Sequence, residues 1–253
     1  LKVAHPEMLK AITASKKKND ATDAEKIADL LRCNLLPQCY MAPEEHRNLR
    51  RILRYRNFLV REAVKMKTKT ASLLMEVGAE YNKSKLHGAK YFQELLTKLD
   101  YVPESIINLL QMTRINMESF SRMQKTLICA LRTDPQISQR VELLMSIQGV
   151  GEITALTWVL EIGDVSRFNR ISQTVSYCGL CSAQKESAGK IYRGPISKKR
   201  NKHLQTVLIE AAKLAPRWNP QLAEVHEREI AKGHRNRATL AVARKLVAYM
   251  LAV

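Results

Sequence analysis

Ser187 lies in a stretch, residues 179–200, that is rich in glycine and basic residues and poor in apolar ones. A serine hydroxyl can attack a phosphodiester if its proton is removed and if fixed cations stabilise the charge that develops on the phosphoryl oxygens. The cations that follow Ser187 within this stretch are Lys190, Arg193, Lys198, Lys199 and Arg200. The stretch therefore suggests phosphate chemistry, while the competing interpretation is a serine that simply occupies a turn.

Asp20 and Asp23 form a second group with possible chemistry. Thr22 and Glu25 have the spacing of a capping box, which predicts a helix with Asp20 just before it and Asp23 in its first turn. Two carboxylates at this spacing can point to the same place, and Mg²⁺ prefers such oxygen ligands. Acidic residues are also favoured in a first turn by the helix dipole alone, so both interpretations stay open.

The segment Ile147, Gly149, Val150 and Gly151 has the pattern of a helix-hairpin-helix turn. Its two glycines allow a tight backbone turn, and the N–H groups that open the next helix would face outward as an anion site. Such a unit binds DNA through phosphates without reading the base sequence. The alternative is a glycine-containing turn between two helices of the core.

Helices must position these groups, because apolar residues recur at helical spacing over most of the chain. The segment after Gly151 is expected to be an amphipathic helix that ends at Gly163. The other helices that we expect run from Pro43 to about Gly78, over a shorter region interrupted at Gly88, from Pro103 to about Leu131, from His203 to Lys213 and from Arg237 to Leu251, the last two separated by residues 216–234.

The 253 residues include 42 Lys and Arg against 24 Asp and Glu, a formal charge of +18. This surplus indicates a polyanionic partner, and nucleic acid fits best. Six arginines crowd residues 47–61, where they could line a nucleic-acid groove or simply cover an exposed helix face. No apolar run or signal peptide suggests a membrane, so we expect a cytoplasmic protein.

Five cysteines show no disulfide framework, which fits a reducing compartment. Cys178 and Cys181 form a CxxC pair, but the sequence offers no second pair of ligands for zinc. Buried thiols are the interpretation that we favour.

Several motifs occur together in one order: KKNDATDAEKIADLL, a long helical middle, LLMSIQGVGEITALTWVLEIGD, RFNRISQTVSYCGL and ESAGKIYRGPISKKRNKHLQTVLIEAA. In this order they resemble insertion-sequence transposases of the DEDD type, which are bridge-RNA-guided recombinases with a RuvC-like N-terminal domain and a C-terminal serine transposase domain. The resemblance covers most of the chain and is strongest over residues 144–212.

The resemblance implies that Ser187 is the nucleophile and forms a covalent phosphoserine link to DNA. Asp20 and Asp23 would be the last two residues of an acidic tetrad that binds Mg²⁺. The first Asp and the Glu of that tetrad lie on earlier strands in the family, so either this sequence is truncated at its N-terminus or its acidic element is degenerate. Lys190, Arg193 and Arg244 are candidates to activate Ser187, and Gly149 and Gly151 would contact DNA.

The same resemblance implies double-stranded donor and target DNA, a guide (bridge) RNA, and a homo-oligomer, either a dimer or a tetramer, assembled through a coiled coil over residues 104–131. The expected fold is mostly α: a remnant of an α/β RuvC-like domain (1–44), a helical and coiled-coil region (45–140), and a helical transposase domain (141–253) with a helix-hairpin-helix and an irregular or β-hairpin loop. The alternatives are a non-catalytic helix-hairpin-helix DNA-binding protein and a RuvC-like metal nuclease, which needs the full tetrad.

Overall fold

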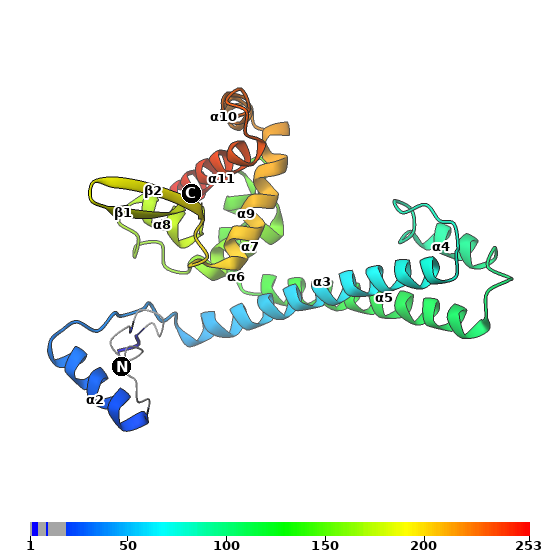
Figure 1. Ribbon diagram of the computed structural model, residues 1–253, viewed down its shortest axis with the longest axis horizontal. Helices are drawn as coiled ribbons and strands as arrows, with labels where there is room; N and C mark the ends of the chain where they lie inside the picture. Colours follow the sequence, from blue (N-terminus) through cyan, green and yellow to red (C-terminus); the bar gives the residue numbers. More distant parts are fainter. Residues whose placement is uncertain (1, 5–8, 10–18) are drawn as a thin grey trace. The chain divides into compact units, whose positions relative to one another are not determined.

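The computed structural model describes residues 2–4, 9 and 19–253, apart from the side chains of Lys185 and Arg193. The described residues are mostly helical, as expected, with one two-stranded antiparallel sheet among them (Figure 1). Contacts divide the chain into two compact units, Leu1–Arg47 and Asn48–Val253. None of the described helices is long and apolar enough to cross a membrane. The domain bounds expected from the sequence remain a prediction.

The first unit contains α2 (Asp20–Arg32). Its N-cap is Asn19, whose side chain accepts a hydrogen bond from the backbone N–H of Thr22 at 2.7 Å. The predicted cap at Thr22 is therefore wrong, because asparagine is the stronger capping residue and Asp20 already belongs to the helix. In the described part of residues 1–44, the expected β structure is limited to an isolated antiparallel bridge between Ala4 and Gln38.

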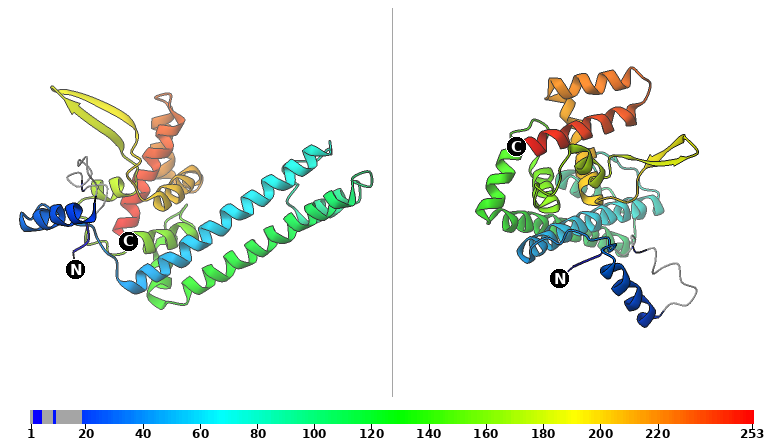
Figure 2. Two further views of the ribbon diagram at one scale, coloured as in Figure 1. Left: turned by 60° about the horizontal axis from the view of Figure 1, so that its bottom comes forward. Right: turned by 90° about the vertical axis from the view of Figure 1, so that its left-hand side faces the viewer.

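The helices α3 (Glu44–Glu76) and α5 (Glu104–Arg132) run side by side as a long helical hairpin, which we call the arm (Figure 2). Buried residues of α3 recur at helical spacing, and the hydroxyls of Thr70 and Thr113 form a buried hydrogen bond of 2.9 Å between the two helices. The short helix α4 (Ala89–Leu96) joins the far end of the arm, where it shares a small hydrophobic core with α3 and α5.

The C-terminal region contains the main hydrophobic core. Its elements are α6 (Pro135–Met145), α7 (Glu152–Ile162), α8 (Ile171–Tyr177), β1 (Ser182–Ser187), β2 (Lys190–Ile196), α9 (Lys202–Leu214), η2 (Ala215–Arg217), α10 (Pro220–Ile230) and α11 (Arg235–Ala252).

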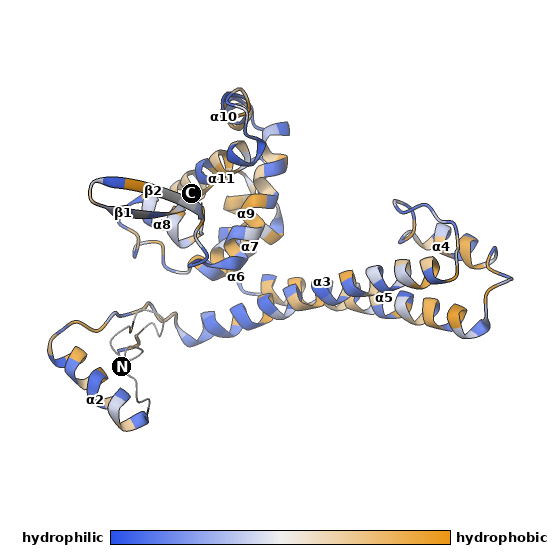
Figure 3. Cartoon of the chain, viewed as in Figure 1, coloured by the Kyte–Doolittle hydropathy of each residue, from blue (hydrophilic) through white to orange (hydrophobic). Residues whose placement is uncertain are grey.

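The central helix of this region is α7, which packs against α6 and α9. Every residue from Thr154 to Ile162 is buried, so the helix has no exposed face over that range. The amphipathic character predicted for this helix is therefore wrong, because neighbouring elements surround it on all sides. Figure 3 shows the contrast between this hydrophobic helix and α3, which is rich in hydrophilic residues.

A helix that the sequence pattern missed, α10, lies in the segment that we expected merely to separate the last two helices. Pro220 occupies its first turn, where proline is tolerated because the first N–H groups of a helix have no partner within it. Leu222 is its one buried residue among those described, so its apolar periodicity is weak.

The strands β1 and β2 form a hairpin in which Ser187 pairs with Lys190. The two residues between them, Ala188 and Gly189, have φ angles of 48° and 73°. Positive φ at both central positions is the signature of a type I′ turn, whose twist matches that of antiparallel strands. The expected irregular or β-hairpin loop is thus a β-hairpin with a tight turn, and its register shifts once between Ser182 and Gln184.

Candidate functional site

Ser187 is the last residue of β1 and lies beside the turn of the hairpin. It is exposed, and no hydrogen bond within the described part of the chain restrains its side chain. Five residue steps separate it from Ser182 at the other end of the strand, a length of about 16 Å at the usual rise. The hairpin therefore presents the Ser187 hydroxyl far from the core, where a large substrate can reach it.

At the base of the hairpin, one hydrogen bond joins its two ends and another joins it to α11. The N–H of Ser197 donates to the carbonyl of Cys181 at 3.0 Å, and Nε of Arg244 donates to the carbonyl of Leu180 at 2.9 Å. Arg244 therefore lies at the base of the hairpin, a strand length from Ser187. Of the three candidate activators, Lys190 is the strand partner of Ser187, and the side chain of Arg193 lies outside the described residues.

A basic turn, defined here as residues 197–201, connects β2 to α9. The hydroxyl of Ser197 accepts from the N–H of Lys199 at 3.2 Å, and the Arg200 guanidinium donates to the Ser197 carbonyl at 3.0 Å. Lys198 and Lys199 are exposed and form no ion pair with the described residues. Their ammonium groups are thus available to an anionic ligand.

Arg200 has a second constraint, because its side chain lies directly over Gly179. A Cβ atom on Gly179 would be 2.7 Å from Cδ of Arg200, and the φ angle of Gly179 is +72°. The glycine in YCGL is therefore needed for close packing of the basic turn.

The glycine turn between α6 and α7 uses its two glycines differently. Gly149 has a φ angle of +95°, and a Cβ atom there would lie 2.6 Å from Cα of Ala215. Gly149 thus packs closely against another part of the protein, as expected for a glycine-containing turn between two helices of the core. Gly151 is the N-cap of α7 and faces open space, so a phosphate could approach its backbone. A DNA contact remains a prediction for both glycines.

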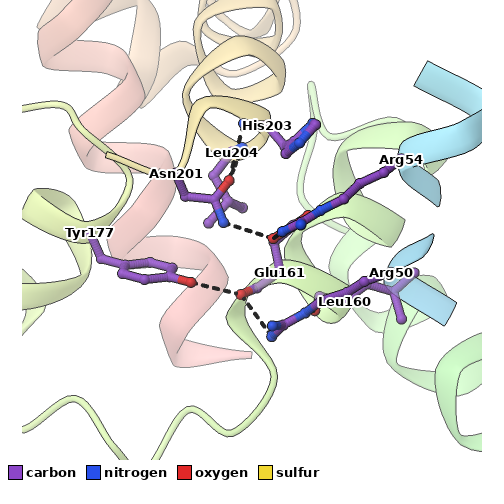
Figure 4. A network of polar contacts seen from close by, with 8 residues as sticks. All are labelled: Arg50, Arg54, Leu160, Glu161, Tyr177, Asn201, His203 and Leu204. Carbon is purple, nitrogen blue, oxygen red and sulfur yellow. Dashed lines mark hydrogen bonds and ion pairs between the residues drawn. The ribbon is translucent and has the colours of Figure 1, made fainter. Parts of the chain in front are cut away.

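A buried carboxylate, Glu161, forms a polar network that sequence reasoning missed (Figure 4). Its side chain is fully buried. The guanidinium of Arg54 binds it in a bidentate manner: Nε donates to Oε1 at 2.8 Å, and a terminal nitrogen donates to Oε2 at 2.9 Å. The side-chain amide of Asn201 donates to Oε2 at 2.8 Å. Burial would raise the pKa of Glu161, but the hydrogen bonds from Arg54 and Asn201 outweigh it and hold the pKa below its ordinary value.

The backbone at the end of α7 is held as well. Arg50 donates to the carbonyls of Leu160 and Glu161, the latter at 3.2 Å, and the hydroxyl of Tyr177 donates to the Glu161 carbonyl at 3.3 Å. Two of the crowded arginines of α3 thus bind the core instead of lining a groove. The signal in the sequence was an acidic residue inside the apolar run LTWVLEIG, which a buried position leaves in need of a cationic partner.

The acidic pair lies at the start of α2. Asp20 is exposed, while Oδ1 of Asp23 is buried and has no hydrogen-bond partner among the described residues. An unpartnered carboxylate oxygen suits a hard cation, but two carboxylates supply less than the octahedral shell of Mg²⁺. Within the described residues, no group of three acidic, histidine or cysteine side chains is placed to hold a metal. Asp20 and Asp23 therefore fit a Mg²⁺ site as some of its ligands and not as the whole set.

The two cysteines of the CxxC pair differ in how deeply they are buried. Cys178 is fully buried, and burial raises the pKa of its thiol to about 12, while Cys181 is partly exposed. This burial agrees with the buried-thiol interpretation for Cys178. The described residues supply no further ligands that would complete a zinc site.

Comparison with known proteins finds two matching family models. One, described as the transposase IS116/IS110/IS902 family, matches residues 141–227. The other, a DEDD transposase model of IS110 elements, matches residues 2–78. The two matches cover the acidic pair at one end of the chain and the hairpin with the basic turn at the other.

Individual relatives are also similar to the chain. The transposase for insertion sequence element IS1111A of Coxiella burnetii is 28% identical over 204 residues, 78% of this chain and 54% of the relative. A putative transposase of Sinorhizobium fredii is 24% identical, over 83% of this chain and 51% of the relative. The transposase for IS1328 of Yersinia enterocolitica is 26% identical, over 97% of this chain and 74% of the relative. The chain thus spans about half the length of the first two relatives.

Proposed function

Because the chain belongs to the IS116/IS110/IS902 family of insertion-sequence transposases, we propose that the whole protein cleaves and rejoins DNA strands with Ser187 as its nucleophile. The observation that carries this proposal is the position of Ser187, exposed beside the turn of a projecting hairpin and paired with Lys190. A hydroxyl presented in this way can enter a groove of duplex DNA without the bulk of the core.

In the proposed reaction, Oγ of Ser187 attacks the scissile phosphorus, the Oγ proton passes to a base, and the phosphorus–oxygen bond to the leaving strand breaks. The leaving oxygen takes up a proton, and the phosphate remains as a serine ester. The hydroxyl of a second strand then attacks that ester and releases Ser187. One phosphodiester is exchanged for another, so no external energy source is needed.

Lys190, Lys198 and Lys199 would hold the phosphates, since an ammonium stabilises charge on phosphoryl oxygens. A carboxylate base for the Ser187 proton would have to come from outside the hairpin tip, because the tip offers one acidic neighbour, Glu186, whose side chain points to the opposite face of the strand from Ser187. A site assembled from more than one part of the protein, or from two protomers, would meet this need.

Asp20 and Asp23 would hold part of a Mg²⁺ site. The ion would supply Lewis-acid stabilisation of charge at the scissile phosphate when bound. The unpartnered Oδ1 of Asp23 supports this assignment, and the remaining ligands would come from other residues and water.

We further propose that double-stranded DNA lies along the basic turn and Gly151, and that a guide RNA and a second protomer complete the assembly. The support for a protomer contact is the arm, which exposes apolar side chains that its own helices do not cover. They include Val64, Met112, Ile115 and Met123, each between 47% and 62% exposed.

The test of the serine mechanism is a covalent adduct. The coding sequence with the DNA that flanks it is carried on a plasmid, and protein recovered after induction is digested and examined by mass spectrometry for an oligonucleotide on the peptide around Ser187. We expect the adduct in the parent protein and none in Ser187→Ala. Ser182→Ala, which changes an exposed serine at the other end of the same strand, serves as the matched control.

An adduct that survives in Ser187→Ala would overturn the serine mechanism. Strand breaks without any adduct, abolished by Asp20→Asn or Asp23→Asn, would favour a RuvC-like metal nuclease. DNA binding without breaks or adducts in the parent protein would favour a non-catalytic DNA-binding protein.

A further inference from the structure

Asn201 connects three elements with a single side chain and its own backbone. Its amide nitrogen donates to Glu161 on α7 at 2.8 Å, and its side-chain oxygen accepts from the N–H groups of His203 and Leu204 at 3.0 and 3.3 Å, which caps α9. Its backbone N–H donates to the carbonyl of Tyr177, the last residue of α8, at 3.0 Å. Asn201 is the last residue of the basic turn, so these hydrogen bonds fix the end of the turn against α7, α8 and α9.

Glu161 in turn joins Asn201 to the arm. The same carboxylate that accepts from Asn201 is held by Arg54 of α3 through two hydrogen bonds. The Glu161 side chain is fully buried, and burying a charged carboxylate costs free energy. Well-packed apolar residues often stabilise a core equally well or better. What the carboxylate offers and an apolar residue lacks is a fixed direction toward two partners on different elements.

We propose that Glu161 is a positioning residue, which holds the basic turn in place through Asn201 and ties it to the arm through Arg54. A displacement of α3 at Arg54 would then be passed to the basic turn by two hydrogen-bonded steps. The role of the turn as a DNA contact rests on the proposed function, whereas the mechanical link does not.

The chemistry of each partner makes the link testable by small changes. Asn201→Asp keeps an oxygen to cap α9 but removes the N–H donor and places a second carboxylate against Glu161. Arg54→Lys keeps the charge but loses the planar pair of donors. Asn219 offers a matched control, because it caps α10 by accepting from the N–H of Leu222 at 3.1 Å and is not among the hydrogen-bond partners of the Glu161 carboxylate, which are Arg54 and Asn201.

The experiment measures hydrogen–deuterium exchange across the whole chain and, separately, binding to a random-sequence duplex of about 30 base pairs. We expect Asn201→Asp to speed exchange in residues 197–204 by about tenfold, beyond any change in the rest of the core, and to weaken duplex binding by a similar factor. Arg54→Lys should act in the same direction on the same peptide, while Asn219→Asp should change neither measurement.

When Asn201→Asp and Arg54→Lys are combined, their effects on exchange in residues 197–204 should be less than additive, because each substitution acts through the carboxylate of Glu161. Exchange in residues 197–204 that stays at the parental rate in Arg54→Lys would overturn the link to the arm. If Asn201→Asp unfolds, Arg54→Lys alone decides the outcome, since half of that side chain is exposed and the change is mild. A local exchange change without any Ser187 adduct in the parent protein would leave the positioning role intact and reject the serine mechanism.

Discussion

Gly149 and Ala215 pack backbone against backbone, so that a Cβ atom on Gly149 would lie 2.6 Å from Cα of Ala215. The contact joins the glycine turn to the segment that follows α9, and Ala215 itself is fully buried. Because the neighbouring atom is backbone, it cannot turn aside as the end of a long side chain could. The glycine turn therefore has a structural requirement that is separate from any contact with DNA.

Gly149→Ala should destabilise the protein strongly. An alanine at a φ angle of +95° costs about 1–2 kcal/mol, and the overlap with Ala215 adds about 1–3 kcal/mol. Urea denaturation followed by tryptophan fluorescence measures the loss, since Trp158 is buried in α7 close to the turn in sequence. Gly151→Ala is the control, because Gly151 has a φ angle of −90° and open space around it. Equal losses in the two variants would contradict the packing argument.

Cys178 should be unreactive in the folded protein. Burial raises the pKa of its thiol from 9.0 to about 12, so its thiolate population is about a thousandfold below that of an ordinary cysteine. Under brief alkylation with iodoacetamide, mass spectrometry should find label on the exposed Cys33 and Cys129 and none on Cys178 until the protein is unfolded. Rapid native labelling of Cys178, or zinc retained after purification, would contradict a buried structural thiol.

Much of the fold follows from local signals in the sequence. The helix expected from Pro103 to about Leu131 is α5 (Glu104–Arg132), and Pro103 directly precedes its first residue, because proline is tolerated where a helix begins. The sequence around Ser187 is compatible with either an irregular loop or a β-hairpin. Ala188 next to Gly189 then provides the two positive φ angles that a tight turn requires.

The features that were missed depend on contacts across long sequence distances. The partners Arg54 and Glu161 are 107 positions apart, and no periodicity within either helix reveals that they meet. The wrong cap at Thr22 has a different origin, because two capping residues, Asn19 and Thr22, compete within one turn. The nucleophilic role of Ser187 stays a prediction from the sequence, whereas its exposure beside the hairpin turn emerged from the structure.

In Glu161→Gln, the free energy of unfolding should depend less on pH in the acid range than it does in the parent protein. The pKa of Glu161 in the folded protein lies below its ordinary value of 4.5, so the charged form stabilises the fold above about pH 4.5, and this contribution is lost as the pH falls through the folded-state pKa. Removing the charge should cost about 2 kcal/mol near neutral pH, less than a fully buried pair because half of Arg54 is exposed.

The measurement for Glu161→Gln is urea denaturation at a series of pH values from neutral to acid. The difference between the parent and variant should shrink as the pH falls below 4.5. Glu210→Gln is a suitable control, because Glu210 pairs with Lys213 at the surface, where such pairs contribute little. A difference that stays constant over the whole pH range would show that the charge of Glu161 is not responsible.

Lys199→Ala should weaken DNA binding in a way that depends on salt but not on base sequence. Each lysine that neutralises a phosphate contributes about 0.9 to the slope of log affinity against log salt concentration, because it releases counterions from the duplex. We therefore expect the slope measured by fluorescence anisotropy to fall by about that amount for two duplexes of unrelated sequence. Lys213→Ala provides the comparison, since Lys213 is exposed at the far end of α9 and already paired with Glu210. A slope that is unchanged in Lys199→Ala, or reduced equally in Lys213→Ala, would place the DNA away from the basic turn.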